Sequence, residues 1–171
     1  GVAAQAVDGP TGGEPLGRSN VLTLFEALGR LGGLRDLTLT TNGTRLARFA
    51  APLKDAGVTR INVSLDSLRA DRFRQITRVG DLDTVLGGIE TARAQGFRRL
   101  KLNSVILRNR NHDEIADLAR FALERGMDIS FIEEMPLGMV GDHDRAEAYY
   151  SSDAILEDLA RSFDLVPSTE T

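Results

Sequence analysis

Two adjacent glycines followed by a carboxylate and a proline form the most informative run of this sequence, Thr11-Gly12-Gly13-Glu14-Pro15. Glycine has no Cβ atom, so a backbone with two neighbouring glycines can approach a ligand closely. The sequence contains no cysteine, so no thiolate is available to hold a metal or to react. The run therefore predicts a ligand-binding loop in a chain that has no thiol chemistry of its own.

Further polar side chains come at the ends of three predicted strands, in the runs Thr40-Thr41-Asn42-Gly43, Ser64-Leu65-Asp66-Ser67 and Glu133-Glu134-Met135. Ligand sites of parallel α/β folds lie at the carboxyl ends of the strands. We therefore expect these three strand ends to converge on one mouth. Lys101 lies inside a fourth predicted strand, and a buried ammonium is costly unless it is paired or contacts an anionic ligand.

Each of these groups also has a structural interpretation. Threonine and asparagine favour turns and helix caps, so Thr40, Thr41 and Asn42 could simply cap a helix that begins near Thr44. The same holds for the serines and the aspartate of the second run. The alternative for Lys101 is an edge strand, where its ammonium would be exposed to solvent.

Helices and strands alternate along the chain, which predicts a parallel sheet. Apolar residues at helical spacing predict helices over residues 21–31, 46–53, 70–77, 81–95, 111–125 and 153–163. Asn111 and Glu114 are placed as a capping box at the start of the fifth helix. Short β-rich runs predict strands over residues 36–41, 60–65, 99–107 and 129–133.

A glycine placed as a helix C-cap precedes each of these strands: Gly33, Gly57, Gly96 and Gly126. Strand side chains alternate between two faces, so positions counted from each glycine share a face. The nearly apolar set, expected to pack on the helices, is Leu37, Leu39, Ile61, Val63, Leu100, Leu102, Ser130 and Ile132. The mostly polar set, expected on the other face, is Thr38, Thr40, Asn62, Ser64, Lys101, Asn103, Phe131 and Glu133. Two-sided strands favour an α/β partial barrel with outer helices over a doubly wound sheet.

Composition narrows the classes of partner. The net charge of -4, with both signs interspersed, gives no basic stripe, so we expect no nucleic-acid partner. No apolar run approaches the roughly 20 residues that cross a bilayer, and residues 1–7 lack the basic segment of a signal peptide. We therefore expect no membrane partner and a cytoplasmic location. His112 and His143 have no metal-ligand spacing, and the acidic residues near His143 suit a solvated loop, so no metal site is assigned.

The glycine run resembles the loop by which radical S-adenosylmethionine enzymes hold the methionine end of their cofactor. Five motifs in order resemble one family of these enzymes, the GTP 3',8-cyclases of molybdenum-cofactor biosynthesis. The motifs are Thr11-Gly12-Gly13-Glu14-Pro15, Thr40-Thr41-Asn42-Gly43, Asn62-Val63-Ser64-Leu65-Asp66-Ser67, Lys101-Leu102-Asn103 and Phe131-Ile132-Glu133-Glu134-Met135-Pro136. Any one of them is weak evidence, but their order and spacing make the resemblance specific.

This resemblance implies an incomplete (β/α)6 barrel with parallel strands and outer helices. It also implies two [4Fe-4S] clusters, one that reductively cleaves bound S-adenosylmethionine to a radical and one that helps to hold the purine of GTP, the substrate. By position in the motifs, Gly13, Ser64 and Met135 would contact S-adenosylmethionine, and Thr40 and Lys101 would contact GTP. An ammonium suits a triphosphate as a compact point charge. No residue is assigned to catalysis.

The chain also departs from the family. Its cluster ligands belong to segments upstream and downstream of this chain, so we expect a central fragment that is inactive alone. We expect residues 1–10 to be an altered or truncated lead-in, because Gly9 and Pro10 suit a turn where the family has a strand. Residues 11–137 would form the partial-barrel core, and residues 138–171 a loop and a C-terminal helix. An open sheet edge would favour self-association, and the protein of the next pathway step is a candidate partner.

Three alternatives stay open from the sequence. The chain could be a cluster-less nucleotide-binding or interaction module, or part of another radical S-adenosylmethionine enzyme. It could also be a barrel lyase that uses Lys101 as a Schiff-base nucleophile, which requires an apolar pocket around the amine.

Overall fold

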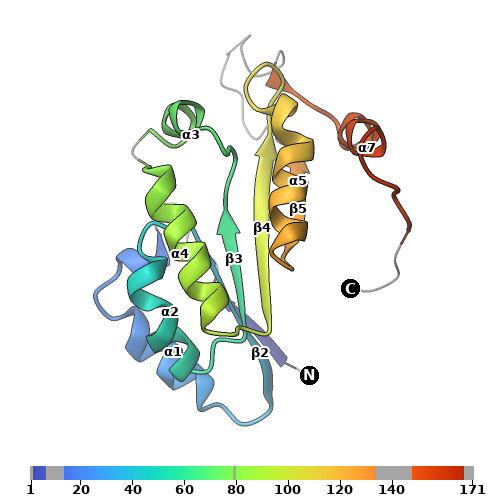
Figure 1. Ribbon diagram of the computed structural model, residues 1–171. Helices are drawn as coiled ribbons and strands as arrows, with labels where there is room; N and C mark the ends of the chain where they lie inside the picture. Colours follow the sequence, from blue (N-terminus) through green and yellow to red (C-terminus); the bar gives the residue numbers. More distant parts are fainter. Residues whose placement is uncertain (1, 7–13, 79, 134–147, 168–171) are drawn as a thin grey trace, which may run out of the picture.

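A computed structural model describes residues 2–6, 14–78, 80–133 and 148–167 (Figure 1). Its centre is a parallel sheet of five strands in the order β1-β2-β3-β4-β5. The strands are β1 (Val2–Ala6), β2 (Leu34–Thr41), β3 (Arg60–Ser64), β4 (Arg99–Ile106) and β5 (Asp128–Glu133). The α-helices are α1 (Val21–Gly29), α2 (Leu46–Asp55), α3 (Ala70–Thr77), α4 (Leu82–Ala94), α5 (Ile115–Glu124) and α7 (Ser152–Ala160). Two short 3-10 helices, η1 (Pro15–Gly17) and η2 (His112–Glu114), complete the described elements.

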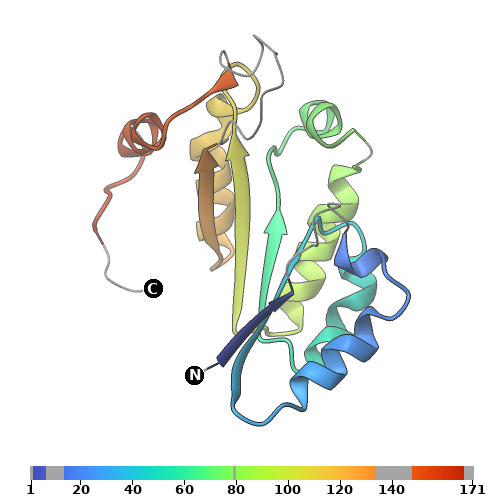
Figure 2. The same cartoon turned by 180° about the vertical axis from the view of Figure 1, so that it is seen from behind.

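Helices α1, α2, α4 and α5 cover one face of the sheet, and the strands present their apolar side chains to them (Figures 1 and 2). Leu37 and Leu39 of β2, Ile61 of β3, and Leu102 and Ile106 of β4 are all buried in this core. The opposite face, here called the inner face, is not covered by any helix of the described residues. This arrangement confirms the predicted α/β partial barrel with parallel strands and outer helices.

Four glycines at positive φ lie in the connections that lead from helices to strands. Gly33, Gly57, Gly96 and Gly126 all have positive φ values, of 86°, 92°, 65° and 65°. Residues that carry a side chain rarely adopt a positive φ. Glycine adopts it at little cost and can therefore reverse the chain after a helix. Gly57, Gly96 and Gly126 directly follow the C-cap residues of α2, α4 and α5, as predicted. Gly33 does not end α1, which ends at Gly29, and lies instead in the turn directly before β2.

One strand was not predicted. β1 pairs in parallel with β2, with Ala3 beside Asp36 and Ala6 beside Leu39. Its three alanines carry little β-propensity, so no strand was predicted there. Residues 7–10, where a turn was predicted, lie outside the described residues.

The face assignment predicted for β5 is wrong by one residue. The register places Leu102 beside Ile129 and Ile106 beside Glu133, and both β4 residues are buried against the helices. Phe131 and Glu133 therefore lie on the helix-covered face, whereas Ser130 and Ile132, predicted to pack on the helices, lie on the inner face.

The connection that leads into β5 explains this shift. Before β3, the buried Val58 and Ile61 are separated by two residues. Before β5, the buried Met127 and the core-packed Ile129 are separated by one residue. The connection is thus one residue shorter, and a shift of one residue moves every side chain of a strand to the opposite face.

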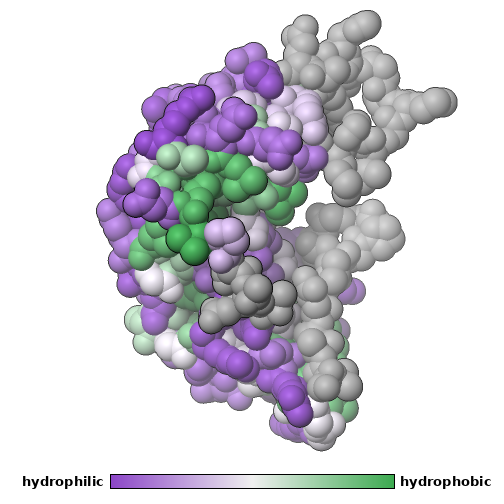
Figure 3. Space-filling model, turned by 90° about the vertical axis from the view of Figure 1, so that its right-hand side faces the viewer, coloured by the Kyte–Doolittle hydropathy of each residue, from purple (hydrophilic) through white to green (hydrophobic). Residues whose placement is uncertain are grey.

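Helix α7 lies against α5 and β5 and is held there by polar contacts. Glu133 accepts hydrogen bonds from the backbone N–H (2.7 Å) and the hydroxyl (2.8 Å) of Ser152, and these bonds lower the pKa of its carboxyl. The side of the molecule that carries α7 shows a hydrophobic area among hydrophilic residues (Figure 3). Leu156, Leu165 and Val166 are the exposed apolar residues of α7 and the segment after it.

Candidate functional site

Glu14 of the glycine run anchors its end of the run to the carboxyl end of β2. Its carboxylate accepts hydrogen bonds from the hydroxyl of Thr41 (2.5 Å) and from the backbone N–H groups of Asn42 (2.6 Å) and Leu16 (3.2 Å). Hydrogen bonds to a carboxylate are stronger than those between neutral groups, so this anchor is well defined. Glu14 thus lies at the predicted mouth, whereas Gly13 lies outside the described residues.

The turn after β2 shows that two of its polar residues are structural. Asn42 accepts hydrogen bonds from the backbone N–H (3.0 Å) and the hydroxyl (2.7 Å) of Thr44, and Thr41 accepts one from the N–H of Gly43 (3.1 Å). A Cβ atom on Gly43 would lie 2.9 Å from a methyl group of Val85. Thr41 and Asn42 therefore hold the turn, but they do not cap α2, which begins at Leu46 without a side-chain cap. No hydrogen bond joins Thr40 to this turn among the described residues.

Thr40 belongs to a row of polar residues that crosses the inner face. The strand register places Thr40 beside Asn62, Asn62 beside Lys101, and Lys101 beside Asp128. The Asn62 amide donates a hydrogen bond to the Thr40 hydroxyl (3.3 Å). The structure therefore brings together the two residues predicted to contact substrate, Thr40 and Lys101, with Asn62 between them.

Lys101 is half-buried, and β4 lies between β3 and β5. The alternative that it lies on an edge strand is therefore wrong. Among the described residues it has no hydrogen-bond or ion-pair partner, so its ammonium can accept an anionic ligand from the open side of the sheet. Its neighbours Asn62 and Asp128 are polar, which does not fit the apolar pocket that a Schiff-base lysine requires.

A second polar row lies closer to the carboxyl ends of the strands. It consists of Ser64, Asn103 and Ser130 on β3, β4 and β5. Ser64 is exposed on the inner face, so its hydroxyl is available to a ligand. Met135, the other residue predicted at the cofactor side besides Gly13, lies outside the described residues. Glu133, one of the polar residues expected at the mouth, instead holds α7.

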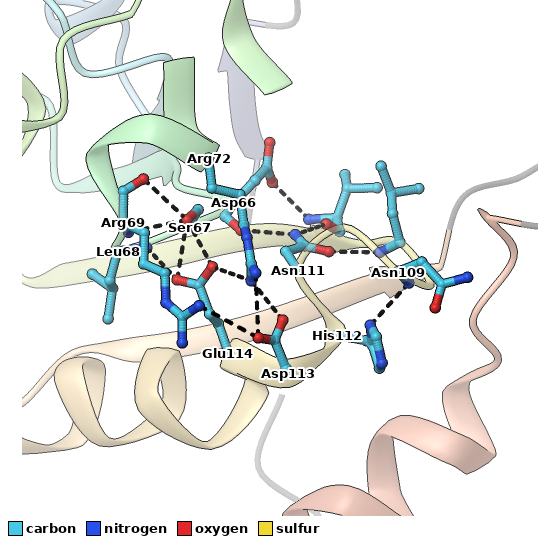
Figure 4. A network of polar contacts seen from close by, with 12 residues as sticks. Asp66, Ser67, Leu68, Arg69, Arg72, Asn109, Asn111, His112, Asp113 and Glu114 are labelled. Atoms are coloured by element: carbon cyan, nitrogen blue, oxygen red, sulfur yellow. Dashed lines mark hydrogen bonds and ion pairs between the residues drawn. The ribbon is translucent and has the colours of Figure 1, made fainter. Parts of the chain in front are cut away.

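Asp66 and Asn111 close the space between the ends of β3 and β4 (Figure 4). Asp66 accepts a hydrogen bond from the N–H of Val105 (2.8 Å). The Asn111 amide donates to the carbonyls of Asp66 (2.7 Å) and Val105 (2.8 Å) and accepts from the N–H of Leu107 (2.7 Å). The predicted capping box is therefore wrong, because the Asn111 side chain bonds to the strand ends instead of capping a helix.

Glu114, the other half of that predicted box, is a buried carboxylate beside α3. It accepts hydrogen bonds from the hydroxyl of Ser67 (2.8 and 3.0 Å), the N–H of Leu68 (2.8 Å) and the guanidinium of Arg72 (2.7 Å) (Figure 4). Arg72 also pairs with the more exposed Asp113 (2.5 Å). A buried charge is tolerated only when it is paired and hydrogen-bonded, and Glu114 meets this condition. The cluster fixes the loop that follows Ser64, the last residue of β3.

Asp66 gives this site a pH dependence. Burial raises the pKa of its carboxyl above the ordinary value of 3.8, although the Val105 N–H opposes the shift. The folded protein thus binds the proton more tightly than the unfolded chain does. The stability that Asp66 contributes is fully present below pH 3.8 and is lost as the pH rises through its folded-state pKa.

We therefore expect the Asp66→Asn variant to gain stability relative to the wild type as the pH rises from 4 to 7 in urea unfolding experiments. Asp113→Asn is the matched control, because its hydrogen bond with Arg72 lowers the pKa of Asp113. For that variant, the advantage of the wild type should fall only as the pH drops below about 3.8, and it should change little between pH 4 and 7. An Asp66→Asn difference that does not change with pH would contradict the burial of this carboxylate.

Sequence reasoning missed three parts of this site. Glu14 was noted only as part of a motif, and its role as an anchor depends on Thr41 and Asn42, which lie far from it in sequence. The Glu114 cluster was not predicted, because Glu114 was assigned to a capping box with Asn111. The pairing of Arg99 with Asp128 has no sequence signal, because it joins different strands.

Metal-binding groups are not found in the part of the chain that the structure describes: no group of three or more His, Cys, Asp or Glu residues could hold a metal ion there. Because the sequence contains no cysteine, its donor set does not fit an iron–sulfur cluster. The hydroxyl and amide groups of the inner face do fit a polar organic cofactor. None of the described helices is long and apolar enough to cross a membrane.

Comparison with curated proteins shows several relatives at high identity. The chain is 57% identical over 161 residues to a GTP 3',8-cyclase of Pseudomonas putida (strain F1), which covers 94% of this chain and 48% of that enzyme. It is 56% identical over the same length to a GTP 3',8-cyclase of Pseudomonas entomophila (strain L48). The chain thus spans about half the length of these relatives.

A solved structure of TYW1 with a lysine–pyruvate adduct bound matches the fold with a TM-score of 0.60. The match covers 93% of this chain and 48% of that one at 18% sequence identity, so it concerns the fold alone. The sequence pattern of the radical SAM superfamily matches residues 11–122, a span that begins at the glycine run and includes Thr40, Ser64 and Lys101. With this match over more than half of its length, the chain belongs to the radical SAM superfamily.

Proposed function

We propose that this chain forms the central part of a GTP 3',8-cyclase and that its inner face binds the substrate. The observation that carries the proposal is the row of Thr40, Asn62 and Lys101, which presents an ammonium without a described partner on an open polar surface. An ammonium on such a surface suits the triphosphate of GTP. The relatives named above support the choice of GTP, since they are GTP 3',8-cyclases.

The cofactor side of the site is proposed to be the mouth at the strand ends. There Gly13, Ser64 and Met135 would contact S-adenosylmethionine, and Glu14 would hold the glycine run against β2. S-adenosylmethionine bound at a reduced [4Fe-4S] cluster would supply the radical that attacks the ribose of GTP. This chain has no cysteine, so both [4Fe-4S] clusters would be held by other segments and the chain alone would be inactive.

Titration calorimetry of the 171-residue chain with GTP and with S-adenosylmethionine tests this assignment. We expect GTP to bind with a dissociation constant below about 1 mM, which corresponds to about 4 kcal/mol or more. Inorganic tripolyphosphate should compete with GTP, because Lys101 would bind the phosphates and not the base. Tight binding that tripolyphosphate does not affect would contradict the proposed orientation.

A second candidate follows from the lack of cysteine: a cluster-less module that binds nucleotides or another protein. A nucleotide-binding module of this kind would bind GTP or S-adenosylmethionine in calorimetry and would take no part in catalysis.

The remaining partners are also proposals. We also propose a cytoplasmic location and, as a partner, the protein of the next pathway step, which would receive the product. Self-association would use the edge of β5, which pairs with no further strand among the described residues, or the hydrophobic area near α7. Light scattering at high protein concentration measures it.

A further inference from the structure

Asp128 stands beside Lys101 on the inner face but is bound to another residue. The register makes the two residues direct neighbours on β5 and β4. Neighbouring strands lie about 4.8 Å apart, so the ammonium and the carboxylate at these positions could meet. Instead, the guanidinium Nε of Arg99 donates a short hydrogen bond to the Asp128 carboxylate.

A second carboxylate on the inner face, that of Asp36, is also paired with arginines. Asp36 of β2 pairs with Arg60 of β3 (3.3 Å) and with Arg98 (3.1 Å), which lies in the loop between α4 and β4. The described strands therefore place Lys101 among Arg60, Arg99, Asp36 and Asp128, with both carboxylates bound to arginines. The lysine is left as the cation without a partner among the described residues.

We propose that Arg99 is a positioning residue that holds Asp128 away from Lys101 and so keeps the ammonium available to a polyphosphate. The claim that this pairing favours polyphosphate binding rests on the proposed function. The claim that Arg99 holds Asp128 away from Lys101 does not. Without Arg99, the Asp128 carboxylate would turn to Lys101, its nearest remaining cation by register. It would then compete with an anionic ligand and also repel it.

Lysine NMR tests this proposal directly, because Lys54 and Lys101 are the only lysines of the sequence. With lysine labelled with ¹³C at Cε, the protein gives two signals. Lys54 lies on α2, where its ammonium bonds to the carbonyl of Gly96 (2.6 Å), and it serves as the internal reference. In the ligand-free protein, Arg99→Met should shift the Lys101 signal and leave the Lys54 signal in place. Adding Asp128→Asn to that variant should return the Lys101 signal to its wild-type position.

Titration with inorganic tripolyphosphate gives the second measurement. We expect Arg99→Met to weaken binding about 10-fold, because it frees one negative charge within about 6 Å of the ligand. The double variant Arg99→Met/Asp128→Asn should recover wild-type affinity within about 2-fold, and so should Arg99→Lys. Arg98→Met is the matched control, because it removes the same charge while Arg60 still holds Asp36. Its affinity should fall less than about 3-fold.

The two measurements separate the two claims. A Lys101 signal that stays at its wild-type position in ligand-free Arg99→Met would overturn the positioning role. So would a double variant that binds as weakly as Arg99→Met. If tripolyphosphate leaves the Lys101 signal of the wild type unchanged while the ligand-free shifts appear as expected, the positioning role holds and the proposed polyphosphate site is wrong.

Discussion

Replacing Glu114 by alanine is expected to lower the free energy of unfolding by about 3–5 kcal/mol, the usual cost of breaking a buried ion pair. The Glu114 side chain is only 1% exposed. Its removal leaves the Ser67 hydroxyl, the Leu68 N–H and one side of the Arg72 guanidinium without their acceptor. A buried donor that has no acceptor is costly, because in the unfolded chain water would accept its hydrogen bond.

Asp113→Ala is the control for this prediction. Asp113 pairs with the same guanidinium (2.5 Å) but is 46% exposed, so its loss should cost less than about 1 kcal/mol. Urea denaturation followed by circular dichroism gives both values. Similar losses for the two variants would show that burial does not set the energy of this cluster, contrary to the structure.

The second large effect is expected for Lys101→Met, which should weaken GTP binding about 10- to 100-fold. A hydrogen bond to a charged group contributes about 1.5–3 kcal/mol, and methionine keeps the length of the side chain but loses the charge. Lys54→Met removes the other lysine, which lies on α2 away from the inner face, and should leave the affinity unchanged. The stability of Lys101→Met should stay close to that of the wild type, since its ammonium has no partner among the described residues.

Calorimetry at two salt concentrations sharpens this test. The affinity of the wild type should fall with added salt more steeply than that of Lys101→Met, because screening weakens the contact of the ammonium with the phosphates. Equal GTP affinities for Lys101→Met and Lys54→Met would remove Lys101 from the substrate site.

Much of the fold could be predicted because its signals are local. A glycine at positive φ depends only on its own backbone, and Gly57, Gly96 and Gly126 marked the ends of their helices correctly. Gly33 marked the start of β2 but not the end of α1. Alternation then assigned the faces of β2, β3 and β4, and α3 was predicted with its observed bounds, Ala70–Thr77. The prediction failed for β5 because a connection shorter by one residue is set by how Met127 packs in the core.

In the candidate site too, residues placed by local signals were predicted correctly, and residues placed by distant partners were not. Thr40, Ser64 and Lys101 lie on the inner face as their strand positions indicated. Asn111 and Glu114 fitted a local capping pattern, yet their side chains bond to strand ends and to α3. Asn111 makes three hydrogen bonds, and Glu114 bonds to Ser67, Leu68 and Arg72, so each side chain has more partners than a cap would provide. The anchor at Glu14 was missed for the same reason.

A chimeric enzyme tests the central claim most directly. Residues 11–122 of this chain would replace the matching segment of the Pseudomonas putida (strain F1) GTP 3',8-cyclase, so that the parent would supply the cluster ligands that this chain lacks. After the iron content confirms full cluster loading, GTP consumption is measured in the presence of S-adenosylmethionine and a reductant. We expect turnover within about 10-fold of the parent, a difference of about 1.4 kcal/mol in the barrier, and a large loss when the chimera carries Lys101→Met. A folded and fully loaded chimera that binds S-adenosylmethionine but does not consume GTP would contradict the assignment of this chain to a GTP 3',8-cyclase.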